Sequence, residues 1–190
     1  MSALRDERAF DSATAALLVG VVLIGLALRL TGLDWGLPNE RALGEPPFHP
    51  DEKVAVAQGA QLYSKPTGTT FIWGGALYMR TAHLVHKVAL ASSEGRHRDG
   101  GLRISVRALR RLNVVFSLIT VVIVAAIAGR LFGPIPGVVA AALMAFVPGP
   151  LLDAHYARPD SLLCMLCAAS LACAVRVALR GGTEWLLAGA

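Results

Sequence analysis

Two adjacent carboxylates, Asp51 and Glu52, follow a histidine and a proline and form the most informative motif of the chain. Pro50 fixes its own backbone φ and pushes His49 into an extended conformation, so the two acids are presented from a stiff turn. The turn comes about twenty residues after a long apolar segment. Near the edge of a bilayer charge is costly, while contacts to an ion or a polar substrate are strong. The motif therefore indicates a site, although two acids in a first helical turn could also serve only to stabilise the helix.

A second polar cluster, residues 153–160, forms a short loop between two apolar segments. Asp160 begins the second of these segments, where a helix cap would explain it, but its polar neighbours favour a site that meets Asp51. Arg158 could bind a phosphate, whereas an arginine at a membrane interface often only reaches the lipid headgroups. Arg29 lies in a similar position at the end of the first apolar segment. The candidate site residues of the loop are His155, Tyr156, Arg158 and Asp160.

The composition is that of a membrane protein. Hydrophobic residues make up 55% of the chain and the mean hydropathy is +0.56, well above an ordinary soluble domain. The net charge is +5, but the arginines gather at residues 96–111 and at the ends of apolar segments. This pattern fits lipid headgroups or a phosphate-bearing ligand better than nucleic acid. The composition predicts an all-α, polytopic integral membrane protein that contacts membrane lipids and binds no nucleic acid.

Apolar runs long enough to cross a bilayer predict four membrane spans. Their expected bounds are about 13–31, 111–131, 134–152 and 160–180. The first run is too long for a signal-peptide core and is expected to remain as an anchor, with the N-terminus in the cytoplasm. The outer loop 32–110 is expected to carry amphipathic juxtamembrane helices at about 52–63 and 71–90. A further apolar run begins at Trp185, so residues 1–190 are expected to be the N-terminal part of a longer transmembrane domain.

Residues 71–90 leave a second topology open. The segment is about long enough to span; if it does, the basic stretch 96–111 is cytoplasmic, and Asp160 and Asp51 lie on opposite sides of the membrane. Several charged side chains of the segment share one helical face, however, which favours a helix lying on the membrane surface. These side chains are Arg80, His83 and Lys87. We therefore expect Asp51 and Asp160 on the same, outer side.

Several stretches together resemble the GT-C superfamily of membrane glycosyltransferases. The closest likeness is to the bacterial members of glycosyltransferase family 39, which are relatives of protein O-mannosyltransferases. The stretches are Leu28–Leu30, Gly32–Pro38, Phe48–Glu52, Arg111–Leu112, Gly129–Gly133 and His155–Asp160. The His-Pro-Asp-Glu element followed by the His-Tyr-Ala-Arg-x-Asp element is the specific part. Two departures leave the acceptor side open: residues 65–73 lack an aromatic-Pro run, and residues 92–101 look like an insertion.

The resemblance implies transfer of a sugar from a polyprenyl-phosphate donor to an acceptor hydroxyl, at the outer (periplasmic) face of the inner (plasma) membrane. Such a reaction needs a base for the hydroxyl, and positive charge or a metal for the departing phosphate. The resemblance assigns the base to Asp51, while Glu52 could orient the acceptor, bind an ion or cap the helix. Asp160 is the third catalytic carboxylate. The expected substrate-binding residues are His49, Arg158, His155, Tyr156 and Arg29.

Metal and redox chemistry receive less support. Carboxylates would suit Mg²⁺ or Mn²⁺, but the sequence does not decide whether a divalent cation is bound, and a site formed by His83, His86 and Asp51 is a minor alternative. Cys164 and Cys167 form a Cys-x-x-Cys pair inside an apolar segment, where small apolar residues in a helix contact are the simpler interpretation.

Two other functions compete with sugar transfer. A truncated or degenerate relative could serve as a non-catalytic scaffold or a lipid-binding subunit, and the end of the chain within an apolar run motivates this alternative. A transporter is less favoured because transporters usually place charges within broken helices near mid-membrane, and here the charges lie at the ends of spans. The identity of the sugar and of the acceptor is open.

Overall fold

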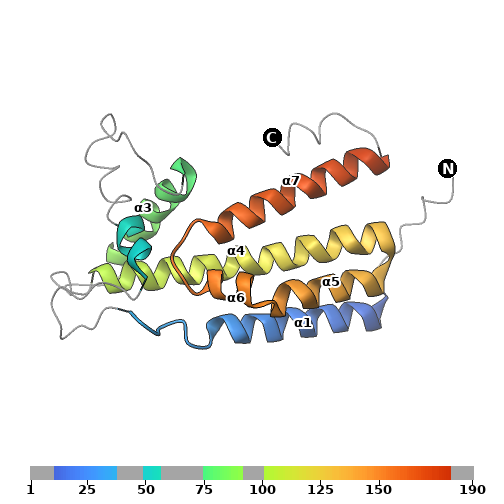
Figure 1. Ribbon diagram of the computed structural model, residues 1–190, viewed down its shortest axis with the longest axis horizontal. Helices are drawn as coiled ribbons and strands as arrows, with labels where there is room; N and C mark the ends of the chain where they lie inside the picture. Colours follow the sequence, from blue (N-terminus) through green and yellow to red (C-terminus); the bar gives the residue numbers. More distant parts are fainter. Residues whose placement is uncertain (1–10, 38–48, 57–74, 92–100, 181–190) are drawn as a thin grey trace. The chain divides into compact units, whose positions relative to one another are not determined.

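The computed structural model describes residues 11–37, 49–56, 75–91 and 101–180, and every regular element within these ranges is a helix. The helices are α1 (Ser12–Leu30), α3 (Ala76–Ala91), α4 (Gly101–Phe132), α5 (Pro134–Phe146), α6 (Pro148–Ala154) and α7 (Asp160–Arg180) (Figure 1). Residues 50–56 form a further short helix. The expected all-α class is confirmed.

Three helices are long and apolar enough to cross a membrane: α1, the Arg103–Phe132 part of α4 and the Asp160–Leu179 part of α7. α5 and α6 make a fourth candidate if they are counted as one span, bent by 58° at the break between them. The break follows from Pro148, because a proline disfavours helical backbone in the residue before it, and Val147 is extended with ψ 132°. The polytopic membrane architecture is therefore confirmed. The number of helices that cross, and the side that each loop faces, stay predictions.

Local sequence explains where the apolar helices begin. Asp11 precedes α1, and its carboxylate accepts the Thr14 N–H at 2.7 Å, a standard N-terminal cap. The hydrogen bonds from Thr14 also lower the pKa of Asp11. Between α4 and α5 the chain turns at Gly133, whose φ of 108° is a conformation that L side chains rarely adopt. Pro134 then occupies the first turn of α5, where its missing N–H costs nothing.

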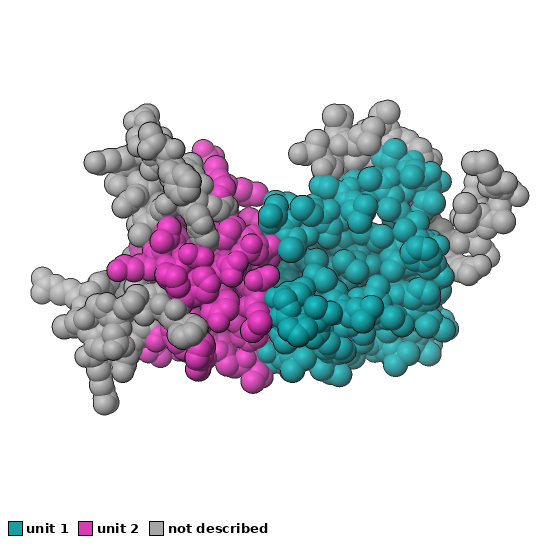
Figure 2. Space-filling view, in the orientation of Figure 1, with its two compact units in different colours: residues 1–28, 115–151, 163–190 teal, residues 29–114, 152–162 magenta. Residues whose placement is uncertain are grey.

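The chain divides into two compact units, which are coloured separately in Figure 2. Unit 1 consists of residues 1–28, 115–151 and 163–190, and unit 2 of residues 29–114 and 152–162. Within unit 1 the core is formed by small and β-branched side chains of α4 and α5, with residues of α1 packed against it. The buried members are Val121, Ala125, Ala141 and Ala145. This composition is typical of helices that pack in a bilayer, where small residues let backbones approach.

α5 packs tightly against α4 at Gly137. A Cβ atom at this position would lie 2.9 Å from the carbonyl oxygen of Ala125 and 3.0 Å from the Cα atom of Gly129. Both neighbours are backbone atoms, so neither can move aside as a flexible side chain would. The glycine is therefore required by the helix contact and not by a turn.

Large apolar side chains are exposed along the helices of unit 1, which suits contact with lipid chains. Among them are Leu17, Leu23, Ile24, Ile135, Leu143, Leu163 and Leu171. Cys164 and Cys167 are exposed on α7 within the described residues, and the helix contact that the sequence analysis expected of them stays a prediction.

Unit 2 contains the polar segments of the chain. Its apolar core joins the short helix 50–56, α3, the start of α4 and the loop before α7, through Val56, Ala82, Val106, Leu109 and Ala157. α4 begins at Gly101, ten residues before the expected start of a span, so most of the basic stretch is helical. The other expected outer helices are partly represented: residues 57–63 and 71–74 lie outside the described residues, whereas 50–56 and α3 are helical.

Candidate active site

The carboxylate motif begins a helix. His49 precedes the helix 50–56 and its carbonyl accepts the Glu52 N–H at 3.2 Å, which makes it the N-cap residue. Pro50 takes the first helical position, as prolines favour. The Nδ1 atom of His49 accepts the Asp51 N–H at 3.3 Å. The side chain of Asp51 is 36% exposed, whereas that of Glu52 is fully buried. The two adjacent acids therefore lie in different environments.

Glu52 forms a buried ion pair with Arg110 of α4. Arg110 Nε and Nη2 donate to the two carboxylate oxygens of Glu52, each at 2.7 Å, and the Arg110 side chain is only 1% exposed. Arg110 Nη1 also donates to the carbonyls of Leu33 and Trp35, both at 2.7 Å. The Ala157 N–H donates to Glu52 Oε1 at 2.8 Å. Because both charges are paired and further hydrogen-bonded, their burial is tolerated.

This ion pair corrects the expectation for the basic stretch. The arginines of residues 96–111 were expected to face lipid headgroups or a phosphate-bearing ligand, but Arg110 points into the core of unit 2. Arg107, one turn away, forms a bidentate pair with Asp34 at 2.7 and 2.9 Å that is partly exposed to solvent. Both carboxylate oxygens of Glu52 accept hydrogen bonds. Glu52 therefore joins its own helix, residues 50–56, to α4 and to the loop before α7.

The loop 155–160 is held by Asn113 of α4. The side-chain amide of Asn113 donates to the carbonyls of Tyr156 and Arg158, at 2.6 and 2.7 Å. His155 Nε2 lies 2.9 Å from the carbonyl of Thr31, an oxygen that can only accept. The backbone of the loop is therefore fixed by α4 and by the residue that follows α1.

Asp160 is paired within the loop. Arg158 Nη2 lies 2.9 Å from Asp160 Oδ2, and Arg158 Nη1 lies 3.8 Å from a carboxylate oxygen of Asp153. Asp160 is 38% exposed and begins α7, so its negative charge also suits the N-terminal end of the helix dipole. Arg158 thus has two acidic neighbours, Asp153 and Asp160.

The Tyr156 ring joins the loop to the carboxylate motif. Its centroid lies 4.9 Å from that of the His49 ring, with the planes tilted by 51°, a geometry in the range of favourable aromatic pairs. The guanidinium carbon of Arg110 lies 5.9 Å from the centroid of the same tyrosine ring, within cation–π distance. Two residues expected to bind substrate, His49 and Tyr156, therefore contact each other.

Unit 2 thus brings together both polar elements that the sequence analysis selected. Arg29 is also in unit 2, and it is fully buried at the end of α1, so it does not extend to the headgroups as an interfacial arginine would. In the described ranges no three His, Cys, Asp or Glu side chains are placed to hold a metal ion. Glu52, which was considered as an ion ligand, contacts an arginine instead.

Sequence reasoning missed two residues of unit 2. Asn113 is a polar residue inside an apolar run, and that signal alone could have selected it. Tyr78 of α3 is 1% exposed; burial raises its pKa well above the ordinary value, and the charges of Glu52 and Asp160 add to the rise. The phenol therefore stays protonated and neutral, beside carboxylates that are 26 or more positions away in the sequence.

α3 is attached to α4 by a second polar contact. His86 Nδ1 lies 2.6 Å from the hydroxyl oxygen of Ser105. Burial lowers the pKa of His86, and the neighbouring His83 lowers it further. His86 is therefore neutral at physiological pH and serves as a hydrogen-bonding partner, not as a cation for headgroups.

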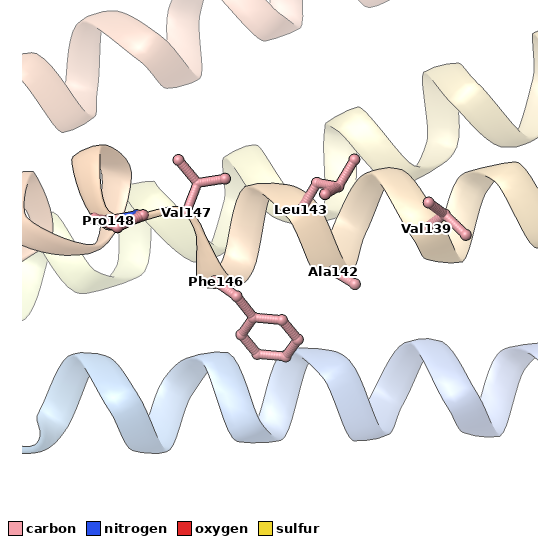
Figure 3. A pocket seen from close by; sticks show the side chains of 6 residues that line it. All are labelled: Val139, Ala142, Leu143, Phe146, Val147 and Pro148. Atoms are coloured by element: carbon pink, nitrogen blue, oxygen red, sulfur yellow. The ribbon is translucent and has the colours of Figure 1, made fainter.

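Unit 1 carries an apolar groove of about 380 Å³ along α5. It is lined by Val139, Ala142, Leu143, Phe146, Val147 and Pro148, and the ring of Phe146 is directed toward α1 (Figure 3). The groove contains no group that could transfer a proton or bind a phosphate. The chemistry-bearing residues described above all belong to unit 2.

Residues 102–190, just under half of the chain, match the family of dolichyl-phosphate-mannose-protein mannosyltransferases. The matched segment includes Arg110, Asn113 and the loop 155–160, whereas His49–Glu52 precede it. Neither the comparison with curated proteins nor that with solved structures gives a match. The family match supports, over residues 102–190, the resemblance to GT-C-type membrane glycosyltransferases that the motifs carried.

Proposed function

We propose that this chain contributes the catalytic base of an enzyme that transfers a sugar from a polyprenyl-phosphate donor to an acceptor hydroxyl on the outer side of the membrane. The observation that carries the proposal is the contrast between two adjacent acids. Asp51 is accessible, while Glu52 is fully engaged by Arg110 and Ala157. Of these two acids, Asp51 is the one whose carboxylate a substrate hydroxyl could approach.

The proposed reaction is an inverting displacement. The acceptor oxygen attacks the anomeric carbon of the sugar while the bond from that carbon to the donor phosphate oxygen breaks. Asp51 takes the proton of the acceptor hydroxyl, and the polyprenyl phosphate leaves with the bonding electrons. Such a base typically contributes about 10²–10⁴-fold to the rate.

Arg158 is the proposed cation for the departing phosphate. A guanidinium can offset developing phosphate charge through two parallel hydrogen bonds. Its contact with Asp160 at 2.9 Å would hold it in place before the donor binds, and Asp160 is accordingly proposed to orient Arg158. His155 fixes the loop through Thr31, and Arg29 is buried within unit 2.

Replacement of Asp51 by Asn tests the assignment. In membranes from cells that express the full-length protein, we expect Asp51→Asn to lower transfer from polyprenyl-phosphate hexoses or pentoses by at least about 100-fold. Asp34→Asn is the matched control, because Asp34 is 58% exposed and is paired with the surface Arg107. Equal protein amounts and equal elution from a sizing column exclude a folding defect. A rate within threefold of wild type in Asp51→Asn would exclude Asp51 as the base.

Sidedness is the second test, because the proposal needs Asp51 and Asp160 on the outer face. In a variant in which the three native cysteines are replaced, a single cysteine at position 51 or 160 is treated with a membrane-impermeant maleimide in spheroplasts. Labelling at both positions is the expected result. Labelling at position 51 alone would mean that residues 71–90 span the membrane, and it would remove Asp160 and Arg158 from the site.

A further inference from the structure

His49 sits at the start of the catalytic helix in a constrained position. Its Nδ1 atom accepts the backbone N–H of Asp51 at 3.3 Å and lies 3.6 Å from Asp51 Oδ2. A backbone N–H can only donate, so this contact assigns the proton of the neutral ring to Nε2. The Nδ1 atom that lies beside the Asp51 carboxylate therefore carries no proton that it could donate to Asp51.

Capping alone does not require a histidine. Serine, threonine, asparagine and aspartate are the usual N-cap residues because a short side chain reaches the free N–H groups. The imidazole ring of His49 is larger and needs support to hold one orientation. That support comes from Tyr156, whose ring centroid lies 4.9 Å away.

Tyr156 itself is fixed from α4. Asn113 holds its carbonyl at 2.6 Å, Arg110 lies over its ring, and the next residue along the loop donates to Glu52. The position of the His49 ring is therefore set by the same helix that anchors the loop of Asp160. A shift of Tyr156 would move His49 and, through Nδ1, the backbone of Asp51.

We propose that His49 and Tyr156 form a positioning pair for Asp51: the Tyr156 ring seats the His49 ring, and His49 Nδ1 fixes the backbone and thereby the carboxylate of the base. The inference rests on the proposed role of Asp51. It differs from the expected one, in which His49 and Tyr156 bind substrate directly. A positioning pair affects kcat with little change in KM, whereas lost substrate contacts raise KM.

The test is a double-mutant cycle in membranes from cells that express the full-length protein, measured with a polyprenyl-phosphate sugar that the wild type transfers. His49→Asn keeps an acceptor for the Asp51 N–H but has no ring to pack on Tyr156. Misplacement of a reacting group by about 1 Å can cost about 10²-fold, so we expect His49→Asn to lower kcat by about 10–100-fold with KM within about twofold. We expect Tyr156→Ala to do the same and the double variant to be no slower than either single variant.

Two controls separate positioning from capping and from folding. Tyr156→Phe retains the ring and should rescue kcat to within about threefold of wild type. Wild-type kcat in His49→Asn would show that capping is the whole role of His49 and would overturn the proposal. Independent, multiplicative losses in the double variant, or a KM rise without loss of kcat, would overturn it as well. Asp51→Asn on the same membranes separates the two hypotheses: if that variant is inactive while His49→Asn is normal, only the positioning pair fails.

Discussion

Removal of the Arg110 guanidinium is the sharpest test of how unit 2 is held together. Arg110→Met keeps much of the side-chain volume but removes all four hydrogen bonds that the guanidinium donates. Among the described residues, the buried carboxylate of Glu52 then keeps the Ala157 N–H alone as a partner. The carbonyls of Leu33 and Trp35 also lose their donor.

The expected loss follows from burial. Breaking a buried ion pair by removing one partner costs about 3–5 kcal/mol, because an uncompensated charge remains in the interior. That is a large part of the total stability of about 5–15 kcal/mol that folded proteins have. Arg107→Met is the matched control, since Arg107 lies one turn away and makes a bidentate pair of similar length with Asp34. That pair is 34% and 58% exposed, so its loss should cost only about 0–1 kcal/mol.

The measurement is urea unfolding of the purified protein in detergent micelles, followed by the fluorescence of its three tryptophans. With a slope of about 2 kcal/mol per molar urea, the Arg110→Met midpoint should fall by about 2 M, and that of Arg107→Met by less than about 0.5 M. In a cycle with Glu52→Leu, the double variant should be more stable than the sum of the single losses by about 2–3 kcal/mol. Equal midpoint shifts for Arg110→Met and Arg107→Met would refute the argument from burial.

Three further predictions use the same unfolding assay. Asn113→Leu removes the donor of two loop carbonyls and should cost about 1–3 kcal/mol; a loss below about 0.5 kcal/mol would show that the loop is held by other contacts. Gly137→Ala should cost about 1–3 kcal/mol, because its Cβ would meet backbone atoms, whereas Gly149→Ala, with nothing within 4 Å, should be neutral or slightly stabilising. The pKa of His86 is lowered on folding, so the unfolded state binds more protons, and stability should fall as the pH drops through and below about 6.5. His86→Gln should make the dependence of stability on pH shallower. An unchanged slope of stability against pH in this variant would contradict the lowered pKa of His86.

The apolar elements could be predicted because length and composition determine them. The expected spans at about 13–31 and 160–180 differ from α1 and α7 by one residue at most at each end. The turn at Gly133 and Pro134 follows from backbone geometry that only these residue types favour. The helix break before Pro148 has the same local origin. None of these features depends on contacts between distant residues.

The polar contacts could not be predicted in the same way, because the sequence gives equivalent signals to residues with different surroundings. Arg107 and Arg110 are three positions apart in one basic stretch, and nothing local distinguishes them. Only the position of a carboxylate 58 residues earlier buries Arg110, while Asp34 meets Arg107 at the surface. The sequence analysis missed Tyr78 for the same reason, because the burial of this side chain depends on how α3 packs.

The pair of acids at positions 51 and 52 shows why adjacency in a helix separates roles. Consecutive helical residues differ by about 100° around the axis, so one can face the core while the next faces outward. Glu52 faces Arg110, and a proton on its carboxylate would leave that buried guanidinium without a charge partner. Asp51 can accept a proton without such a penalty, because its carboxylate is accessible and its backbone is held by His49. Under the proposed function the two acids have separate roles: Glu52 fixes the helix against α4, and the accessible Asp51 acts as the base.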